Sequence, residues 1–477
     1  MNKRIQRALV LGSIAMFGLS ACSSDDKKTA ASSDAASSES SESDTSASAG
    51  SGNVLNVPAD FKTIQKAVDA SKPGDLILIA EGTYNEGVDV TAPKHDITIR
   101  GVDRNKVILD GKDTLENGIR VLGTDGIVVE NMTAHNYKSN GFYWTGSDRY
   151  RGSYLTAYRN GDYGIYSFDA YHGQFDHSYG GGSPDAGFYI GECYKCDAVI
   201  DNVIAENNGL GYSGTNSGGD LYIVNSTFRN NRAGMVPNSG SYELCYPSRE
   251  TTIVGNTVYD NNNNEADAID NALLAQGNGI LLAGAVRSVV ERNLVYKHDR
   301  VGVAAVPFPE EDGNDTKPDA SEDSKPCSVS REEAVAAEAD IPPVILWDGR
   351  DNRFVGNSVS ESGLADISSA TLDNADLPKL NNCFSENTFT TSAPVDLELL
   401  APCDGTGNGG DFTAGALDLS PLIAEQAPKP PKGTYLKSPI PGDQETMPNA
   451  SKAAHPKFTA PAKPDIAAIK LPTKPAA

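Results

Sequence analysis

A glycine followed by an apolar or aromatic residue recurs along the middle of the chain at a nearly fixed interval. The interval is 23 or 24 residues, with one longer gap that indicates an insertion. The copies begin at Gly118, Gly141, Gly164, Gly187, Gly211, Gly234, Gly279 and Gly302. A short fixed period is the signature of a solenoid, in which each repeat packs only on its neighbours. Residues one period apart are therefore expected to be neighbours in space.

The glycine also sets which side chains face inward. The residue after it is large and apolar or aromatic in the copies, namely Ile119, Phe142, Ile165, Phe188, Tyr212, Met235, Ile280 and Val303. Side chains alternate along a strand, so this column is expected in the core and the following column on the outside. The outward column carries Tyr143, Tyr166 and Tyr189 on successive repeats. These tyrosines should form an exposed ladder with a spacing of about 4.8 Å.

A second short strand in each repeat ends in a polar turn residue, usually asparagine. We expect one recurring position to hold Asn131, Asn202, Asn225, Asn256, Asn293, Asn357 and Asn387. Stacked amides can hydrogen-bond along the axis of a coil, as side-chain ladders do in other stacked β structures. These asparagines are therefore interpreted as scaffold. The same turn carries Tyr154 and His177 on two adjacent repeats, and such breaks of a local rule favour a functional site.

The N-terminal part of the repeat region begins LNVPADFKTIQKAVDASKPGDLILIAEGTY. Phe61, Ile64, Ala67 and Val68 form one apolar face of a short helix that ends at a Lys-Pro-Gly turn. This opening resembles the pectin-lyase-like family of right-handed parallel β-helices. The resemblance implies an all-β solenoid over residues 53–405, built of coils of about 23 residues with a short N-terminal capping helix. The scaffold hosts lyases, hydrolases, esterases, epimerases and adhesins, so it does not select a chemistry.

The N-terminus predicts export. Residues 1–21 combine basic residues, an apolar run and small residues, which is the pattern of a signal peptide. The sequence Leu-Ser-Ala-Cys ending at Cys22 resembles a bacterial lipobox and implies lipidation of that cysteine. Residues 22–52 are rich in Ser, Ala and Asp and are expected to be a disordered tether. We therefore expect a membrane-anchored lipoprotein outside the cytoplasm, at the cell surface, the outer membrane or the periplasm.

Two further segments stand apart from the repeats. Residues 306–343 form an acidic insertion, with a capping box at residues 330–333 that predicts one helix. Residues 406–477 form a C-terminal tail rich in Pro, Lys and Ala, which is typical of an extended chain. The net charge of −24 argues against a nucleic-acid partner. It fits a neutral or cationic partner, or carboxylates that hold divalent cations.

Seven cysteines leave six once Cys22 is lipidated. An even number outside the cytoplasm predicts disulfides. Cys383 and Cys403 bracket a short loop and form the best predicted pair. Cys193 and Cys196 favour a local disulfide over a metal or redox site, because no second pair of this kind completes a zinc site. The partners of Cys245 and Cys327 stay open.

Aromatic residues gather on the repeats that begin at Gly141, Gly164 and Gly187. Eleven of the nineteen tyrosines lie between residues 137 and 194. Exposed aromatic rings suit the apolar faces of sugar rings. Tyr143, Trp144 and Tyr189 are therefore predicted to bind a polysaccharide, either an acidic one or a cell-surface glycan. The alternative is that stacked tyrosines only stabilise neighbouring strands.

Charged residues follow the tyrosines at matching positions. Five residues after the glycine, Asp169 and Glu192 should face each other on adjacent repeats. Two carboxylates that close raise one pKa or hold a cation, which predicts general acid–base chemistry or a calcium site. Eight residues after the glycine, Arg149, His172 and Lys195 should form a basic stripe. Such a stripe would neutralise a uronate or an enolate-like intermediate.

The segment from Tyr166 to His172 is similar to the Tyr-Gly-Phe-Asp-Pro-His motif of mannuronan C5-epimerases. The resemblance implies proton transfer by Tyr166 and His172, with Asp169 in support. Ser167 and Ala170 depart from that motif, and the histidine lies one residue further along.

Asp176 and His177 form a second acid–imidazole candidate, for which the alternative is a solvated turn. The sequence thus predicts a monomeric β-helix that binds polysaccharide and modifies it as a lyase, an epimerase or a glycoside hydrolase. The contrasting hypotheses are a non-catalytic adhesion protein and a periplasmic maturation factor. The sequence identifies no metal site beyond the expectation of calcium.

Overall fold

The computed structural model describes residues 52–327, 341–424 and 428–474. The predicted signal peptide, Cys22, the tether up to residue 51 and the capping box at residues 330–333 lie outside these ranges. Among the described residues, no helix has both the length and the apolar character needed to cross a membrane.

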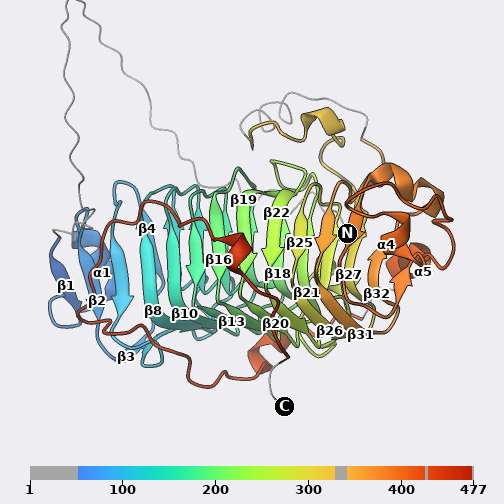
Figure 1. Cartoon of the computed structure of the whole chain (residues 1–477). Helices are drawn as coiled ribbons and strands as arrows, with labels where there is room; N and C mark the ends of the chain where they lie inside the picture. Colours follow the sequence, from blue (N-terminus) through green and yellow to red (C-terminus); the bar gives the residue numbers. More distant parts are fainter. Residues whose placement is uncertain (1–51, 328–340, 425–427, 475–477) are drawn as a thin grey trace, which may run out of the picture. The chain divides into compact units, whose positions relative to one another are not determined.

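The described chain winds into a parallel β-helix whose strands stack coil upon coil (Figure 1). One strand of each coil belongs to an eleven-stranded parallel sheet. Its members are β4 (Val88–Thr91), β7 (Ile119–Leu122), β9 (Phe142–Thr145), β11 (Ile165–Phe168), β14 (Ala186–Gly191), β18 (Leu210–Thr215), β21 (Ala233–Asn238), β24 (Ile280–Ala283), β27 (Val301–Val306), β32 (Ala365–Ser369) and β34 (Ser392–Ala393).

The remaining parallel strands form a twenty-one-stranded sheet that bends round the rest of each coil. Its first row holds β1 (Val54–Val57), β2 (Leu76–Ile79), β5 (Thr98–Gly101), β8 (Val128–His135), β10 (Arg151–Tyr158), β12 (Gln174–Asp176), β16 (Ala198–Asp201), β19 (Ser217–Val224), β22 (Arg249–Val254), β25 (Val289–Glu291), β30 (Arg353–Val355) and β33 (Cys383–Ser385). The second row continues β8 and β10 and holds β3 (Gly82–Tyr84), β6 (Val107–Asp110), β13 (Tyr179–Gly181), β17 (Ile204–Glu206), β20 (Thr227–Arg229), β23 (Thr257–Tyr259), β26 (Leu294–His298) and β31 (Ser358–Ser362). The short strand β15 (Cys193–Tyr194) pairs with β19.

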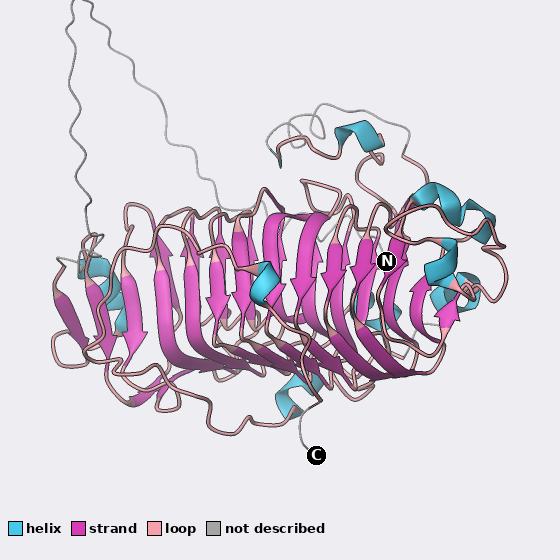
Figure 2. Cartoon of the chain, viewed as in Figure 1, coloured by secondary structure: helices cyan, strands magenta, loops and turns pink. Residues whose placement is uncertain are grey.

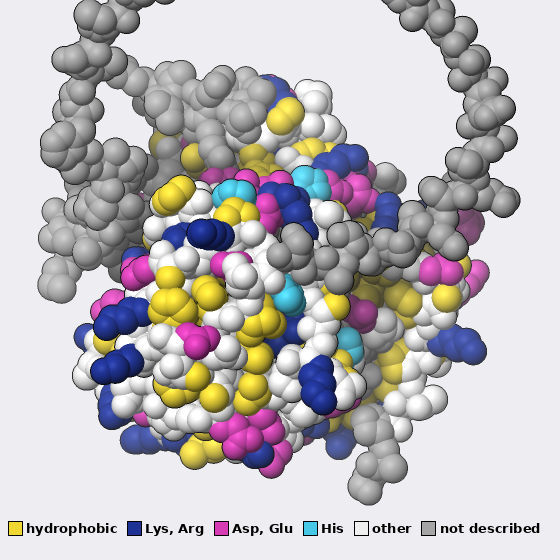
Figure 3. All heavy atoms as spheres, turned by 90° about the vertical axis from the view of Figure 1, so that its left-hand side faces the viewer, with side chains coloured by type: hydrophobic (Ala, Val, Ile, Leu, Met, Phe, Trp, Pro, Cys, Tyr) yellow, Lys and Arg dark blue, Asp and Glu magenta, His cyan; other side chains and the backbone are white. Residues whose placement is uncertain are grey.

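Helices close the two ends of the coil (Figure 2). The predicted capping helix is α1 (Ile64–Ala70), whose N-terminus is capped by the Thr63 side chain. It buries Ile64, Ala67 and Val68 against the first coil, because these residues lie on one helical face. Figure 3 views this end and shows acidic and basic side chains mixed over its surface. At the opposite end, α4 (Leu397–Leu400) covers the last coil with Leu397 and Leu400.

The predicted inward column is confirmed. Strand pairing places Ile119, Phe142, Ile165, Phe188, Tyr212, Met235, Ile280 and Val303 in one register. Each of these side chains is at most 1% exposed. The glycine that precedes the column is required by space, because a Cβ at Gly164 would lie 2.7 Å from the carbonyl oxygen of Gly187. The glycine therefore recurs once per coil because adjacent coils approach each other closely at this position.

Each coil from Gly141 to Asn230 turns at four corners, where the backbone has a positive φ. The first corner column is Gly146, Asp169, Glu192 and Asn216, and the second is Arg149, His172, Asp197 and Asp220. The third is Tyr154, His177, Asn202 and Asn225, and the fourth is Arg159, Gly182, Asn207 and Asn230. Asn and Asp tolerate this conformation better than other non-glycine residues, which explains their frequency at the corners.

The prediction that seven asparagines share one position is wrong, since they occupy two adjacent columns. Asn131, Asn202 and Asn225 lie on the third corner column with positive φ. Asn256, Asn293, Asn357 and Asn387 lie one residue later, because Thr227 pairs with Thr257 and places Asn256 beside Ser226. Only this second set forms the hydrogen-bonded ladder. The sequence pattern alone does not distinguish these two columns, because both carry asparagine and they differ by one residue.

The ladder amides bond to one another and to the backbone. The backbone N and Nδ2 of Asn256 both donate to Oδ1 of Asn293 at 3.0 Å, and Asn293 repeats this to Asn357. Asn387 ends the ladder on the carboxylate of Glu398 in α4, with its Nδ2 2.7 Å from Oε1. A second ladder joins Asn208, Asn231 and Asn261 inside the coil.

The structure contains three disulfides among its described residues. Cys383–Cys403 and Cys193–Cys196 are paired as predicted. The third bond joins Cys245 to Cys327 across a sequence separation of 82 residues. It ties the loop after β21 to the acidic insertion. The insertion contains β28 (Phe308–Glu311), which pairs antiparallel with β29 (Val344–Trp347), the strand that follows the insertion.

Two short helices lie in long connections, α2 (Asp270–Leu274) and α5 (Leu419–Ala424). Short 3-10 helices occur at Ala320–Glu322, Asn374–Leu380, Thr434–Lys437 and Ile466–Ala468. Residues 428–474, which we call the strap, form no strand and lie against the coils. Their contacts include Lys457–Asp96, Lys463–Asp220 and Lys474–Glu361 ion pairs.

Removing one ladder amide should destabilise the coil far more than removing a corner amide. Asn293→Ala leaves the buried N and Nδ2 groups of Asn256 without their acceptor, and we expect a loss of about 2 to 4 kcal/mol of unfolding free energy. The exposed corner variant Asn202→Gly keeps the positive φ accessible and should change stability by less than about 0.5 kcal/mol. Urea unfolding followed by circular dichroism measures both. Equal losses would contradict the two-column assignment.

Candidate active site

The outer face of the eleven-stranded sheet carries the predicted tyrosine ladder. Tyr143, Tyr166 and Tyr189 pair in register on β9, β11 and β14. The ring centroids of Tyr143 and Tyr166 are 4.9 Å apart, and those of Tyr166 and Tyr189 are 4.7 Å apart. Tyr163 joins from the preceding turn, with its ring 4.5 Å from that of Tyr166. The four rings form one continuous aromatic surface.

The ladder is less exposed than predicted. Tyr143, Tyr163 and Tyr166 are half-buried, whereas Tyr189 is 1% exposed. The Tyr189 hydroxyl donates to the carboxylate of Glu243 and lies 2.6 Å from both of its oxygens. The prediction of an exposed ring at Tyr189 is therefore wrong, because a loop residue covers it. Phe168 extends the accessible part, with its ring parallel to that of Tyr166.

First-corner residues hold the loop that carries Glu243. Asn216 Nδ2 donates to the backbone carbonyls of Gly240 and Glu243 at 2.6 and 2.7 Å. The backbone N of Leu244 donates to Glu192 Oε2 at 3.1 Å. Glu192, one of the predicted catalytic residues, thus lies directly beside Glu243. Burial is the main cause of the raised pKa of Glu243, and the nearby charges of Glu192 and Asp185 add to it.

Two aspartates lie where the ladder strands begin. Asp162 and Asp185 lie on adjacent coils just before β11 and β14, and the backbone N of Asp185 donates to the carbonyl of Asp162. Burial raises the pKa of Asp162 to about 6. Burial also raises the pKa of Asp185 far above its usual range, and the charge of Asp162 raises it further. Like charges this close favour the retention of one proton by the pair.

The structure places the predicted catalytic residues on two different corners. Asp169 and Glu192 follow one another in the first corner column, as predicted. His172 lies in the second, where its Nδ1 is 2.5 Å from Asp148 and its Nε2 is 3.6 Å from Asp197. Tyr166 packs against tyrosine rings instead. The motif residues Tyr166 and His172 therefore contact different groups, and the described contacts do not join them.

The predicted basic stripe is wrong at its third member. Arg149 and His172 share the second corner column, but the next residue in it is Asp197, because Gln174 pairs with Val199. Lys195 lies outside the column, and its nearest acidic partner is Asp220 at 3.9 Å. Arg149 itself is bound to Asp96 at 2.8 Å. The column thus passes from basic residues, Arg149 and His172, to acidic ones, Asp197 and Asp220, since the coil gains two residues at this point.

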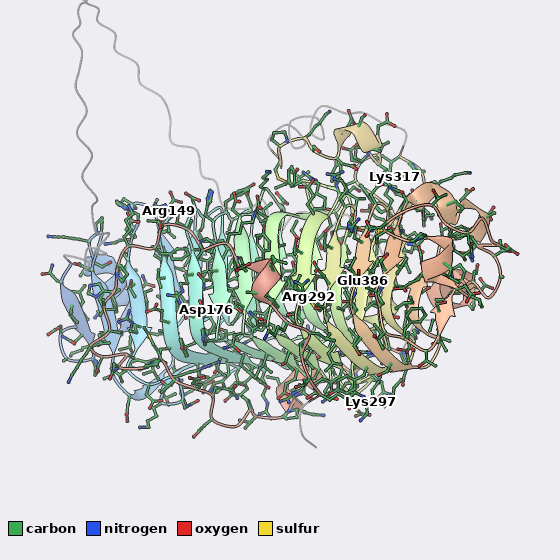
Figure 4. All side chains as sticks on the ribbon, in the orientation of Figure 1. Arg149, Asp176, Arg292, Lys297, Lys317 and Glu386 are labelled. Atoms are coloured by element: carbon green, nitrogen blue, oxygen red, sulfur yellow. A yellow bond between two sulfur atoms is a disulfide. The ribbon has the colours of Figure 1, made fainter. Side chains whose placement is uncertain are left out.

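Trp144 and His177 also lie in other surroundings than the sequence predicted. Trp144 is 0% exposed and packs inside the coil on Tyr150 and Phe175, so the prediction that it binds substrate is wrong. It lies on the inward side of the strand alternation. His177 lies on the third corner, where its ring stacks on Tyr154 at 4.5 Å and its Nδ1 bonds to Asp176. Figure 4 shows Arg149 at the upper edge and Asp176 on the front face of the coil.

Sequence reasoning missed Asp162, Asp185 and Glu243. Asp162 and Asp185 occupy the same place before their glycines, one period apart, so the repeat could have found them. Glu243 comes from a loop outside the period and carries no comparable signal. Among the described residues, no three His, Cys, Asp or Glu side chains are arranged to hold a metal ion. Calcium binding stays a prediction, and the contacts of the described residues do not locate a site for it.

Comparisons with known proteins concern the coil. The model of the right handed beta helix region family matches residues 87–244. No curated protein matches the chain. Solved structures with some similarity include the A-module of mannuronan C-5 epimerase AlgE4 from Azotobacter vinelandii, with 14% identity, a TM-score of 0.43, and coverage of 76% of this chain and 96% of that one.

Two further structures have lower scores. Pectate lyase Pel9A has 12% identity and a TM-score of 0.37, covering 76% of this chain and 87% of its own. An alginate lyase from Paenibacillus sp. FPU-7 has 14% identity and a TM-score of 0.38, covering 71% of this chain and 99% of its own. Such low similarity assigns no chemistry. The family match over residues 87–244 and the stacked parallel coils agree on the fold, a right-handed parallel β-helix.

Proposed function

We propose that this protein acts on a polysaccharide and that its tyrosine–carboxylate site hydrolyses a glycosidic bond. The observation that carries the proposal is the adjacent pair of half-buried Asp162 and buried Asp185, beside the aromatic surface of Tyr143, Tyr166 and Phe168. A half-buried aromatic surface offers stacking to sugar rings. A carboxyl pair that holds one proton offers the general acid that a leaving sugar oxygen needs.

The two sides of the ladder then have different roles. Asp162 and Asp185 share the proton that passes to the glycosidic oxygen. Glu192, which lies beside Glu243, supplies the carboxylate that activates water or attacks the sugar. Glu192 suits this role because the backbone N–H of Leu244 stabilises its ionised form.

Hydrolysis is favoured over elimination or epimerisation by the charges around the site. Removing the proton beside a uronate carboxylate requires a cation that neutralises that carboxylate. Arg120, whose charge acts on Tyr143, is bound to Asp89 at 2.9 Å. The described carboxylates therefore outweigh the cations here, so a neutral sugar is expected at the cleavage point.

A second candidate function is glycan recognition without turnover, favoured by the continuous ring contacts of the ladder. In either case we propose that the protein works outside the cytoplasm, anchored through Cys22, since the N-terminal segment resembles that of a lipoprotein. Disulfides are typical of such a compartment.

Substitution of the acid pair should remove hydrolysis. Asp185→Asn is expected to lower kcat on a cleaved polysaccharide by about 10²- to 10⁴-fold, because the general acid is lost. Glu243→Gln should also lower it, whereas Asp201→Asn, on the other sheet, should not. Release of reducing ends from a panel of neutral and acidic polysaccharides measures this. Ultraviolet absorbance from unsaturated products would instead support elimination, and binding without any product would support recognition alone.

The acid pair should also leave a signature in the pH dependence of stability. The pKa of Asp162 is 3.8 when unperturbed and about 6 in the folded protein, so the folded state binds more protons between these values. Stability from this group is present at low pH and is lost as the pH rises through about 6. Between pH 4.5 and 7.5 the wild-type Tm should therefore fall more than that of Asp162→Asn. Identical Tm changes in the two proteins, with Asp201→Asn as reference, would exclude a buried proton at Asp162.

A further inference from the structure

The strap covers a cluster of buried arginines on the outer face of the twenty-one-stranded sheet. The part of the strap that covers these arginines lies over the third corner of the coils, whereas the loop beside the tyrosine ladder is held by the first corner. Gln444 bonds to Asn105, and the Thr446 hydroxyl donates to Asn131 Oδ1 at 2.8 Å. The strap then continues to Lys457, whose Nζ is 2.9 Å from Asp96. Figure 1 shows its red trace along the coils.

Arg104 is a buried cation without a carboxylate partner among the described ion pairs. The residue is 2% exposed. Its guanidinium donates to the Thr156 hydroxyl at 2.7 Å and to the carbonyls of Leu155, His177 and Glu445 at 2.5 to 3.0 Å. All four acceptors are neutral, and burial lowers the pKa of Arg104 to about 9, although the charge of the strap residue Glu445 opposes that shift without a direct ion pair. A buried guanidinium is normally paired with an anion, because its desolvation is otherwise uncompensated.

Arg100 also bonds to carbonyl groups of the strap. It is 1% exposed, and its Nε donates to Glu130 at 2.6 Å. Its two terminal nitrogens donate to strap carbonyls, those of Ala450, Ala453 and Ala454, at 2.8 to 3.2 Å. Three carbonyl oxygens thus occupy the fork that guanidinium groups usually present to a carboxylate, sulfate or phosphate.

A polar cavity lies between the strap and the sheet at this point. It has a volume of about 180 Å³ and is lined by Arg100, Glu130 and Arg151 from the coils and by His455 and Phe458 from the strap. The buried Nε2 of His455 has no hydrogen-bond partner among the described groups. Burial and the charge of Arg100 lower the pKa of His455, so the ring is neutral and can accept or donate one further bond. The cavity therefore has unsatisfied polar capacity next to the cationic cluster.

We propose that the Arg100–Arg104 cluster is a binding site for an anionic sugar, carrying a carboxylate or a sulfate, and that the strap occupies it as an internal substitute. The strap carbonyls stand where the ligand oxygens would bind. A true anion would give Arg104 a directly bonded counter-charge, which the neutral carbonyls do not supply, whereas Arg100 already has Glu130. Binding then requires displacement of residues 444–457, so the observed affinity is the intrinsic one reduced by the fraction of molecules with an open strap.

The experiment compares the full chain with a version whose strap is weakened. Thr446→Val and Lys457→Ala together remove the bond to Asn131 and the ion pair with Asp96. Calorimetry would titrate trigalacturonate, a sulfated trisaccharide and neutral cellotriose into both proteins. We expect the double variant to bind an anionic trisaccharide about threefold to tenfold more tightly than wild type, in line with the modest strength of exposed pairs. Lys474→Ala, which removes the distal pair with Glu361, is the matched control and should leave the affinity unchanged.

Two further measurements test whether the anionic sugar binds at Arg104 under the strap. Arg104→Gln in the weakened background should abolish the gain, while Arg104→Lys should keep part of it and shows that the fold survives. Hydrogen exchange of strap amides 444–457 should speed up when the anionic sugar is added. Unchanged exchange, equal binding of cellotriose, or a gain that persists in Arg104→Gln would overturn the proposal. Hydrolysis at the tyrosine ladder is read separately by reducing ends, so failure of one site does not imply failure of the other.

Discussion

The backbone at the corners is the constraint on which the rest of this structure depends. A coil that must close in about 23 residues reverses direction several times, and each reversal uses a residue of positive φ. Such residues are costly unless they are glycine, asparagine or aspartate. The cost is offset by contacts that repeat from coil to coil, above all the asparagine ladder that runs through Asn256, Asn293 and Asn357 and ends on Glu398.

The corners also determine where chemistry can occur. Bulky or charged residues such as Tyr154, His172 and Glu192 adopt the strained conformation on the very coils that carry the tyrosine ladder. Each corner projects its side chains toward a different outer surface. Residues only a few positions apart, such as Asp169 and His172, therefore belong to separate columns. One coil offers several independent surfaces, and two of them hold the candidate hydrolytic site and the arginine cluster under the strap.

Much of the fold could be predicted from the sequence because the coil is periodic. The glycine interval located the inward column and the register of the tyrosines, and the apolar spacing between Phe61 and Val68 located the capping helix. Errors arose where the period changes by one or two residues, as between His172 and Asp197, or where two adjacent columns both use asparagine. The site was harder, since Glu243 reaches Tyr189 from a loop with no repeat signal, and the cover over that ring follows from tertiary contacts alone. The strap's contacts have no local signature in its Pro-rich composition.

The disulfide between Cys245 and Cys327 connects a residue two positions from Glu243 to the acidic insertion. In a reducing environment the loop around Glu243 would depend on the hydrogen bonds from Asn216 and to Glu192. The coil itself needs no such bond, because its ladders and inward column are complete without it. Oxidation of this cysteine pair therefore bears on the loop that brings Glu243 to Glu192, and not on the ladders that hold the coils together.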